Sequence, residues 1–157
     1  MSQNTDGQIC FGILLEEGTE LPWDEDDECG YGDVEEWWME LNGYTPPFEI
    51  WEKNSAEYLS DITSEMRDQY YEHRRQWKKA NPVPVELVNY CSSDYSMYIL
   101  ALPETCINAN RGYPLPFEPN DLVVSSERAI ELVRFCGKYD IDIGEEYPRW
   151  WLSSYWG

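Results

Sequence analysis

The clearest feature of the hydrophobic pattern is a run of apolar residues near the start of the chain. Residues 8–15 read QICFGILL, with apolar side chains at nearly every position instead of at alternate ones. Strands that are covered on both faces have this pattern. The run therefore predicts a strand in the middle of a sheet.

Three later stretches also have the composition of strands. Residues 83–91 (VPVELVNYC) and 97–102 (MYILAL) lie on either side of a short polar turn, and residues 149–156 read RWWLSSYW. Pro84 cannot donate a ladder hydrogen bond, which places the first of these stretches at a sheet edge. The unbroken apolar run at 97–102 predicts an internal strand, and 149–156 is the fourth strand.

Helical periodicity predicts three helices. The first begins at Asp33, whose side chain can cap it, and stops at Asn42-Gly43, with Trp37 and Trp38 on its apolar side. The second runs from about residue 55 to residue 80 and ends before Pro82, because the residue before proline is pushed out of the helical region. The third is capped by Ser125 or Ser126 and ends near Cys136.

With the short helix at 33–42 set aside, the order of elements is strand, helix, strand, strand, helix, strand. This order, with two internal and two edge strands, is that of a ferredoxin-like split β-α-β sheet with helices on one face. We therefore expect an α+β fold and a single domain over residues 1–157. Residues 16–54 would be an acidic insertion after the first strand, and the proline-rich residues 103–121 a long loop.

Composition indicates a folded protein despite its charge. Hydrophobic residues make up 42% of the chain, and eight Trp and twelve Tyr are far from the signature of acidic disorder. The N-terminus has no cationic segment, and apolar runs are short. We expect a soluble cytoplasmic protein.

Charge is distributed unevenly along the chain. The formal net charge is −20, and residues 1–65 carry 18 carboxylates against one cation, Lys53, whereas residues 66–157 carry 13 against 10. Eleven carboxylates lie between Glu16 and Glu36, a stretch without Lys, Arg or His. The simpler interpretation is a solvated loop that keeps the protein soluble. The alternative is a surface that attracts a basic partner.

Residue types for catalysis and metal binding are missing or misplaced. The one histidine, His73, lies on the long predicted helix beside Arg74 and Arg75, and no motif for an activated nucleophile or phosphate loop is present. Asp24, Asp26, Glu28 and Glu35 match positions 1, 3, 5 and 12 of an EF-hand loop, but Cys29 stands where glycine is required. We expect no enzyme activity, no cofactor and no metal.

The five cysteines are odd in number and form no C-x-x-C pair, which indicates free thiols. Cys10, Cys91 and Cys136 fall on apolar faces and are interpreted as packing residues. Cys29 lies among carboxylates, which would raise its pKa and make it a poor nucleophile.

A nucleic-acid decoy would use the acidic stretch directly. Duplex DNA carries about one charge per 1.7 Å of axis, so 20 excess charges correspond to ~34 Å of duplex. Such a surface would block the basic groove of a nucleic-acid-binding host protein, and would itself bind neither nucleic acid nor an anionic membrane. Trp23 and Tyr31 would be the anchors. The predicted partner-binding residues are Glu16, Glu17, Glu20, Trp23, Asp24, Glu25, Asp26, Asp27, Glu28, Tyr31, Asp33, Glu35 and Glu36.

Two other classes remain open. A carbohydrate-active enzyme or carbohydrate-binding module would use tryptophans and carboxylates, and would need an aromatic-lined cleft with two carboxyl groups at a glycosidase separation. A phage structural or assembly protein would instead copurify with virions.

The stretches EEGTELPWDED, PVELVNYCS and PRWWLSSYWG together resemble small acidic accessory proteins of tailed bacteriophages. The likeness spans most of the chain and rests on no motif of known chemistry. It implies an anti-host or anti-defence protein that inhibits a host nuclease, a restriction system or a CRISPR effector. No binding residues are carried over from that group.

Overall fold

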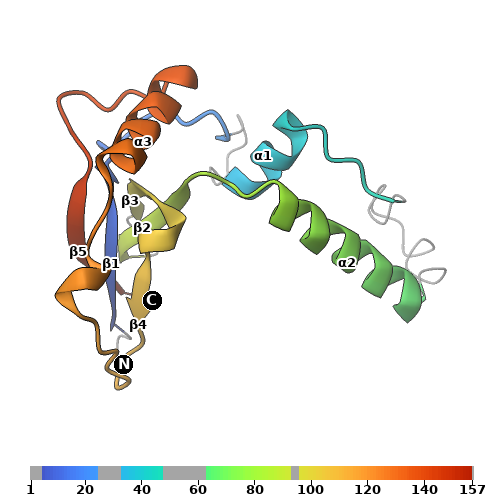
Figure 1. Cartoon of the computed structure of the whole chain (residues 1–157), viewed down its shortest axis with the longest axis horizontal. Helices are drawn as coiled ribbons and strands as arrows, with labels where there is room; N and C mark the ends of the chain where they lie inside the picture. Colours follow the sequence, from blue (N-terminus) through green and yellow to red (C-terminus); the bar gives the residue numbers. More distant parts are fainter. Residues whose placement is uncertain (1–4, 25–32, 48–62, 93–95, 157) are drawn as a thin grey trace. The chain divides into compact units, whose positions relative to one another are not determined.

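The computed structural model describes residues 5–24, 33–47, 63–92 and 96–156. In this part of the chain five strands and three α-helices form a mixed α+β fold, as the sequence predicts. The chain divides into two compact units, which are described separately (Figure 1). The sheet unit comprises residues 1–34 and 84–157, and the helical unit comprises residues 35–83. The expectation of a single domain stays a prediction.

Strand β1, Thr5–Leu14, is the centre of the sheet unit. One edge pairs antiparallel with β5, Arg149–Trp156, from Thr5 opposite Trp156 to Gly12 opposite Arg149. The other edge pairs first with β4, Ile107–Ala109, and then with β3, Ser96–Ala101. The predicted internal position of this strand is confirmed.

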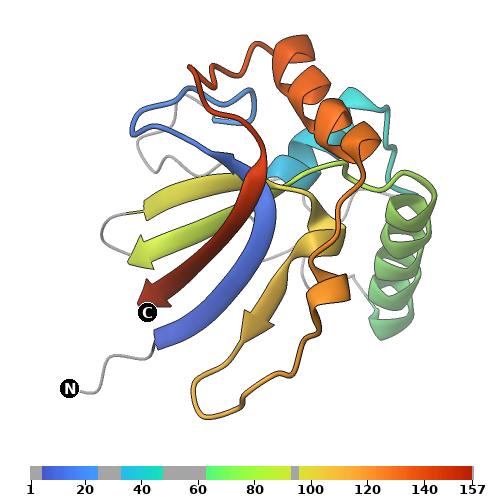
Figure 2. The same cartoon turned by 60° about the vertical axis from the view of Figure 1, so that its left-hand side comes forward.

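The sheet is strongly curled, so that the two strands predicted at its edges, residues 83–91 and 149–156, are neighbours (Figure 2). β2, Glu86–Ser92, pairs antiparallel with β3, and its last two residues pair in parallel with Tyr155 and Trp156 of β5. β4 also falls inside the segment predicted as a loop, because three residues are too short to show a period. A ferredoxin-like arrangement is therefore not confirmed.

The gap between β4 and β3 along β1 is closed by a side chain. Thr105, in the short 3-10 helix η2 (Pro103–Thr105), is 7% exposed, and its Oγ1 accepts the Phe11 N–H at 2.9 Å and donates to the Leu102 carbonyl at 2.7 Å. Leu102 N–H in turn donates to the Phe11 carbonyl at 3.0 Å. The backbone of β1 thus stays hydrogen-bonded where it changes neighbours.

Gly12 lies where β1 meets β3 and β5 at once. A β-carbon at this position would lie 2.4 Å from the Leu100 carbonyl oxygen and 2.8 Å from the Ala101 α-carbon. Only glycine allows two backbones to approach this closely. A larger residue at this position would therefore push β1 and β3 apart.

Alternate residues of the strands face two cores. Cys10, Val88, Ile99 and Ala101 form a buried cluster on the inner face of the curled sheet. Ile13 and Leu100, both 0% exposed, point to the other face. In the same unit, helix α3, Ser126–Lys138, buries Leu132, Phe135 and Cys136, and begins where Ser125 accepts the Arg128 N–H, as predicted.

The helical unit contains α1, Val34–Leu41, and α2, Ser64–Ala80. α1 begins after Asp33 and is followed by Asn42 and Gly43 (φ 72°), as predicted. Thr63 caps α2 through the Met66 N–H, and α2 ends before Asn81 and Pro82 as predicted. α2 starts later than predicted: Thr63 has an extended backbone, so one continuous helix does not run from residue 55 to residue 80. The predicted helical residues 55–62 lie outside the described residues.

Contacts between α1, α2 and the segment after α1 hold the helical unit together. The Trp38 indole N–H donates to the Asn81 carbonyl at 3.3 Å. The Tyr44 ring packs against Trp77 and His73, with ring centroids 5.4 and 5.6 Å apart. None of the helices in the described part of the chain is both long and apolar enough to cross a membrane.

Candidate functional site

The first half of the predicted acidic surface is an ordered loop that follows β1. Leu15, Leu21 and Trp23 are 5%, 8% and 3% exposed, and the Leu15 N–H donates to the Tyr98 carbonyl of β3 at 3.1 Å. Turn hydrogen bonds, such as Thr19 N–H to the Glu16 carbonyl at 3.1 Å, fix its backbone. The carboxylates of the loop, Glu16, Glu17, Glu20 and Asp24, are exposed. Apolar residues therefore face inward and acids outward.

Trp23 does not lie on the surface where an anchor would be needed. Its side chain is 3% exposed, so it supports the fold of the acidic loop and is closed to a partner in this structure. The sequence did not reveal this because a lone tryptophan among carboxylates has no periodicity that indicates burial. Tyr31 and Glu25, Asp26, Asp27 and Glu28 lie outside the described residues.

The carboxylates at the start of α1 already have cationic neighbours. Glu35 forms an ion pair with Lys78, and Glu36 with Arg74 at 3.4 Å, while Asp33 is exposed before the first turn. Partly exposed pairs such as these contribute about 0 to 1 kcal/mol each. Glu35 and Glu36 therefore link α1 to α2. Because Lys78 and Arg74 partly neutralise them, they would attract a basic partner less strongly than the acids of the loop after β1.

A second acidic loop that the sequence analysis did not single out lies beside the first. The loop before β5 lies next to the loop after β1. This is seen at Gly144, where an added β-carbon would lie 3.7 Å from Glu16 Oε1. Asp140, Asp142 and Glu145 are exposed there, and the Asp142 carboxylate accepts the Gly144 N–H at 2.9 Å. The antiparallel pairing of β1 with β5 is the signal that would have found it, because it places both loops at one end of the sheet.

We call this surface the acidic end; its residues are Glu16, Glu17, Glu20, Asp24, Asp140, Asp142 and Glu145. The neighbouring Glu146 is paired with Arg149 at 2.7 Å. Burial raises the pKa of Asp24 above its usual range, against the opposing effect of the Leu21 N–H that donates to its carboxylate. The acidic end is thus an anionic surface on a fixed backbone, made from two segments far apart in the sequence.

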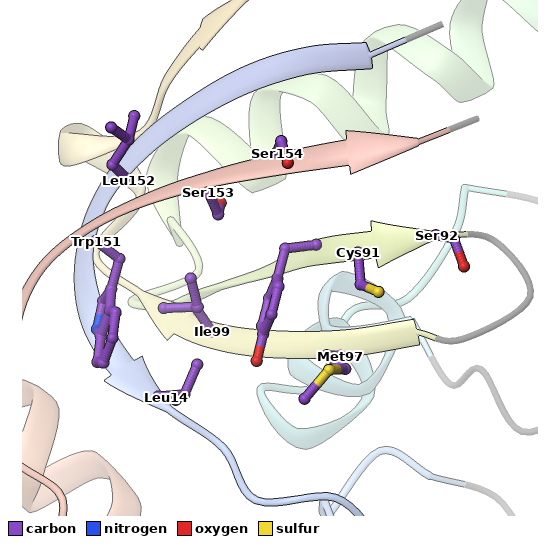
Figure 3. A pocket seen from close by; sticks show the side chains of 10 residues that line it. Leu14, Cys91, Ser92, Met97, Ile99, Trp151, Leu152, Ser153 and Ser154 are labelled. Carbon is purple, nitrogen blue, oxygen red and sulfur yellow. The ribbon is translucent and has the colours of Figure 1, made fainter. Parts of the chain in front are cut away.

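An apolar hollow of about 910 Å³ opens on the inner face of the curled sheet (Figure 3). Leu14 and Trp151 line one end of it, and Met97 and Cys91 line the other. The Trp151 indole N–H is held by the Gly12 carbonyl at 2.9 Å, and the Arg149 guanidinium lies 5.1 Å from the Trp151 ring. Burial raises the pKa of Tyr90, which also lines the hollow.

A second hollow, of about 430 Å³, is polar. It is lined by Asp6 and Glu86 together with amide side chains and Tyr155. The carbohydrate interpretation requires tryptophan and two carboxyl groups in one cleft. Counting only residues that the structure describes, the lining of the polar hollow includes two carboxylates and no tryptophan, and the lining of the apolar hollow includes a tryptophan and no carboxylate. These two hollows therefore do not supply that combination.

The described cysteines differ in exposure. Cys10 and Cys136 are buried, as predicted, whereas Cys91 is exposed, because β2 takes a left-handed turn there (φ 78°). The Cys106 thiol is hydrogen-bonded with Cys10, and this bond together with burial raises the Cys106 pKa. Within the described ranges, no group of three or more His, Cys, Asp or Glu could hold a metal ion. Cys29 lies outside them.

Alkylation rates should follow this difference. Burial raises the pKa of Cys136 to about 11, so at pH 8 its thiol stays protonated as well as covered. We expect iodoacetamide to modify Cys91 roughly 100-fold faster than Cys136 in the native protein. Peptide mass spectrometry after timed labelling measures both rates, and labelling in denaturant should equalise them. Equal rates in the native protein would contradict the burial of Cys136.

Comparisons of the chain with models of protein families, with curated proteins and with solved structures find no match.

Proposed function

We propose that the protein is an acidic inhibitor that imitates the charge of a nucleic acid and occupies the basic groove of a host nucleic-acid-binding protein. The observation that carries this proposal is the acidic end. Its two loops place seven carboxylates on one end of the sheet unit, on backbones fixed by buried leucines, Trp23 and turn hydrogen bonds. A fixed array of charges favours a basic partner more specifically than a flexible acidic chain would.

The likeness to acidic accessory proteins of tailed phages supports the same proposal. On this basis the partner is a nuclease, a restriction enzyme or a CRISPR effector, or another protein that normally holds DNA or RNA. The protein itself neither binds nucleic acid nor catalyses a reaction under this proposal. Because the contacts are largely electrostatic, binding weakens as salt rises.

The test is a charge reversal with a matched control. Glu16, Glu17, Glu20 and Glu145 are replaced together with lysine, and the control replaces the exposed acids Glu40, Glu65, Asp68 and Glu127, none of which belongs to the acidic end. Both variants change the net charge by the same amount. At about 0.5 kcal/mol for each exposed contact, the first set should weaken binding roughly 30-fold or more and the control far less.

The measurement begins with a pull-down from a bacterial lysate at low and high salt, followed by titration of the captured protein with each variant. Support requires that the captured protein binds nucleic acid, that added duplex displaces it, and that the reversal of the acidic end weakens it selectively. A principal partner that survives high salt and both reversals equally would disprove the proposal.

A further inference from the structure

The apolar hollow has the properties of a small-molecule site. Its volume of about 910 Å³ lies within the range of roughly 300–1,000 Å³ that such sites occupy, and its lining is mostly aliphatic, aromatic and thioether groups. Leu14, Met97, Ile99 and Trp151 converge on it from β1, β3 and β5 (Figure 3). The Trp151 ring is held in place by its bond to the Gly12 carbonyl. The lining is therefore largely preformed.

One polar group in the wall points to a ligand with a hydrogen-bonding atom. Ser153 lines the hollow, on the same face of β5 as Trp151. Its Oγ is buried from solvent and makes no hydrogen bond to any residue that the structure describes. Buried hydroxyl groups in proteins are nearly always hydrogen-bonded. The oxygen is covered in this rotamer, so a ligand would satisfy it once the Ser153 side chain turns toward the hollow.

The charges on the protein restrict the ligand further. Among the residues that the structure describes, no Asp, Glu, Lys or Arg lines the hollow, so these residues would not neutralise an ionised ligand. The chain as a whole carries a formal charge of −20, which disfavours an anion. Aromatic rings are favoured over aliphatic chains, because Trp151 and Tyr90 offer ring contacts and Met97 a thioether.

We propose that this hollow binds a neutral or cationic aromatic compound, with its ring among Leu14, Met97 and Trp151 and a polar substituent hydrogen-bonded to Ser153. The site is separate from the acidic end and does not depend on the inhibitor function. Whether the protein captures a basic partner and whether it binds an aromatic compound are therefore distinct results.

Three probes with the same ring system test the proposal by calorimetry and ligand-observed NMR. They are 2-naphthol, which is neutral and has a hydroxyl; 2-methylnaphthalene, which has the same shape and no hydroxyl; and 2-naphthoate, which is an anion. We expect 2-naphthol to bind about three- to tenfold more tightly than 2-methylnaphthalene, the usual effect of one hydrogen bond. We expect 2-naphthoate to bind most weakly.

Two variants and one control assign any binding to the hollow. Ser153→Ala should remove the preference for 2-naphthol over 2-methylnaphthalene and keep the binding of the latter. Met97→Trp should obstruct one end of the hollow and weaken the binding of both compounds. Ser126→Ala, which removes an exposed hydroxyl of α3 away from the hollow, should change nothing. Circular dichroism shows which variants are folded.

The proposal is overturned if wild-type protein binds neither 2-naphthol nor 2-methylnaphthalene, or if folded Met97→Trp binds them as wild type does. A folded Ser153→Ala that keeps the full preference for 2-naphthol overturns the role of the serine. If Met97→Trp does not fold, chemical-shift changes at Trp151 and Leu14 on addition of 2-naphthol decide the site. Shifts confined to other residues would contradict it.

Discussion

Replacing Gly12 with alanine should destabilise the protein by about 3 kcal/mol or more, the upper part of the range for overpacked positions. The new β-carbon would lie 2.4 Å from the Leu100 carbonyl oxygen, 2.8 Å from the Ala101 α-carbon and 2.9 Å from Ile99 Cγ2. Two of these three atoms belong to the backbone of β3, which cannot move away by a change of rotamer. Chemical denaturation followed by tryptophan fluorescence measures the loss.

Gly7 offers a matched control on the same strand. A β-carbon there meets nothing within 4 Å, so Gly7→Ala should change the free energy of unfolding by only a few tenths of a kcal/mol. The comparison separates the crowding at Gly12 from the general effect of alanine in β1. Equal stability of the two variants would show that β1 and β3 are not as close as the structure places them.

Truncating Leu132 to alanine should be the second most damaging of these changes. Its side chain is 1% exposed in the middle of α3, and removing a buried leucine side chain costs about 2–5 kcal/mol, depending on how far the cavity collapses. The loss should appear as a lower denaturation midpoint with an unchanged dependence on denaturant.

The neighbouring Val133 is the control for this change. It is 39% exposed on the same helix, so Val133→Ala should cost less than about 1 kcal/mol. A variant of Leu132 that is no less stable than the variant of Val133 would mean that α3 packs through a different face.

The sequence predicted the elements whose signals are local. The unbroken apolar run at 8–15 indicated the internal strand, Ser125 the cap of α3, and Asn81-Pro82 the end of α2; each is confirmed. In these places the residues that determine the structure are neighbours in the chain. Hydrophobic period and capping chemistry were therefore sufficient.

Features that depend on contacts between distant segments were not predictable in this way. In the sequence, Gly12 is one more residue of a predicted strand. Its role is to let β1 approach β3 closely, and its partner there, Ala101, lies almost 90 residues later in the chain. The pairing of β2 with β5 follows from the curl of the sheet, and so does the loss of the expected edges. Only the first loop of the acidic end was predicted. The second loop lies beside it because β1 pairs with β5, a contact between distant segments.

The pairing of β1 with β5 also determines when the sheet unit can be completed during synthesis. Residues 5–12 are synthesised long before their partners on one edge, residues 149–156. Until β5 has been made, that edge of a largely apolar strand exposes unpaired backbone groups, which are a template for association with other chains. Contacts of such long sequence separation also slow folding. A nascent chain that lacks β5 is therefore a natural substrate for chaperones, and a stop codon before residue 149 would remove the partner of β1 along with the last strand.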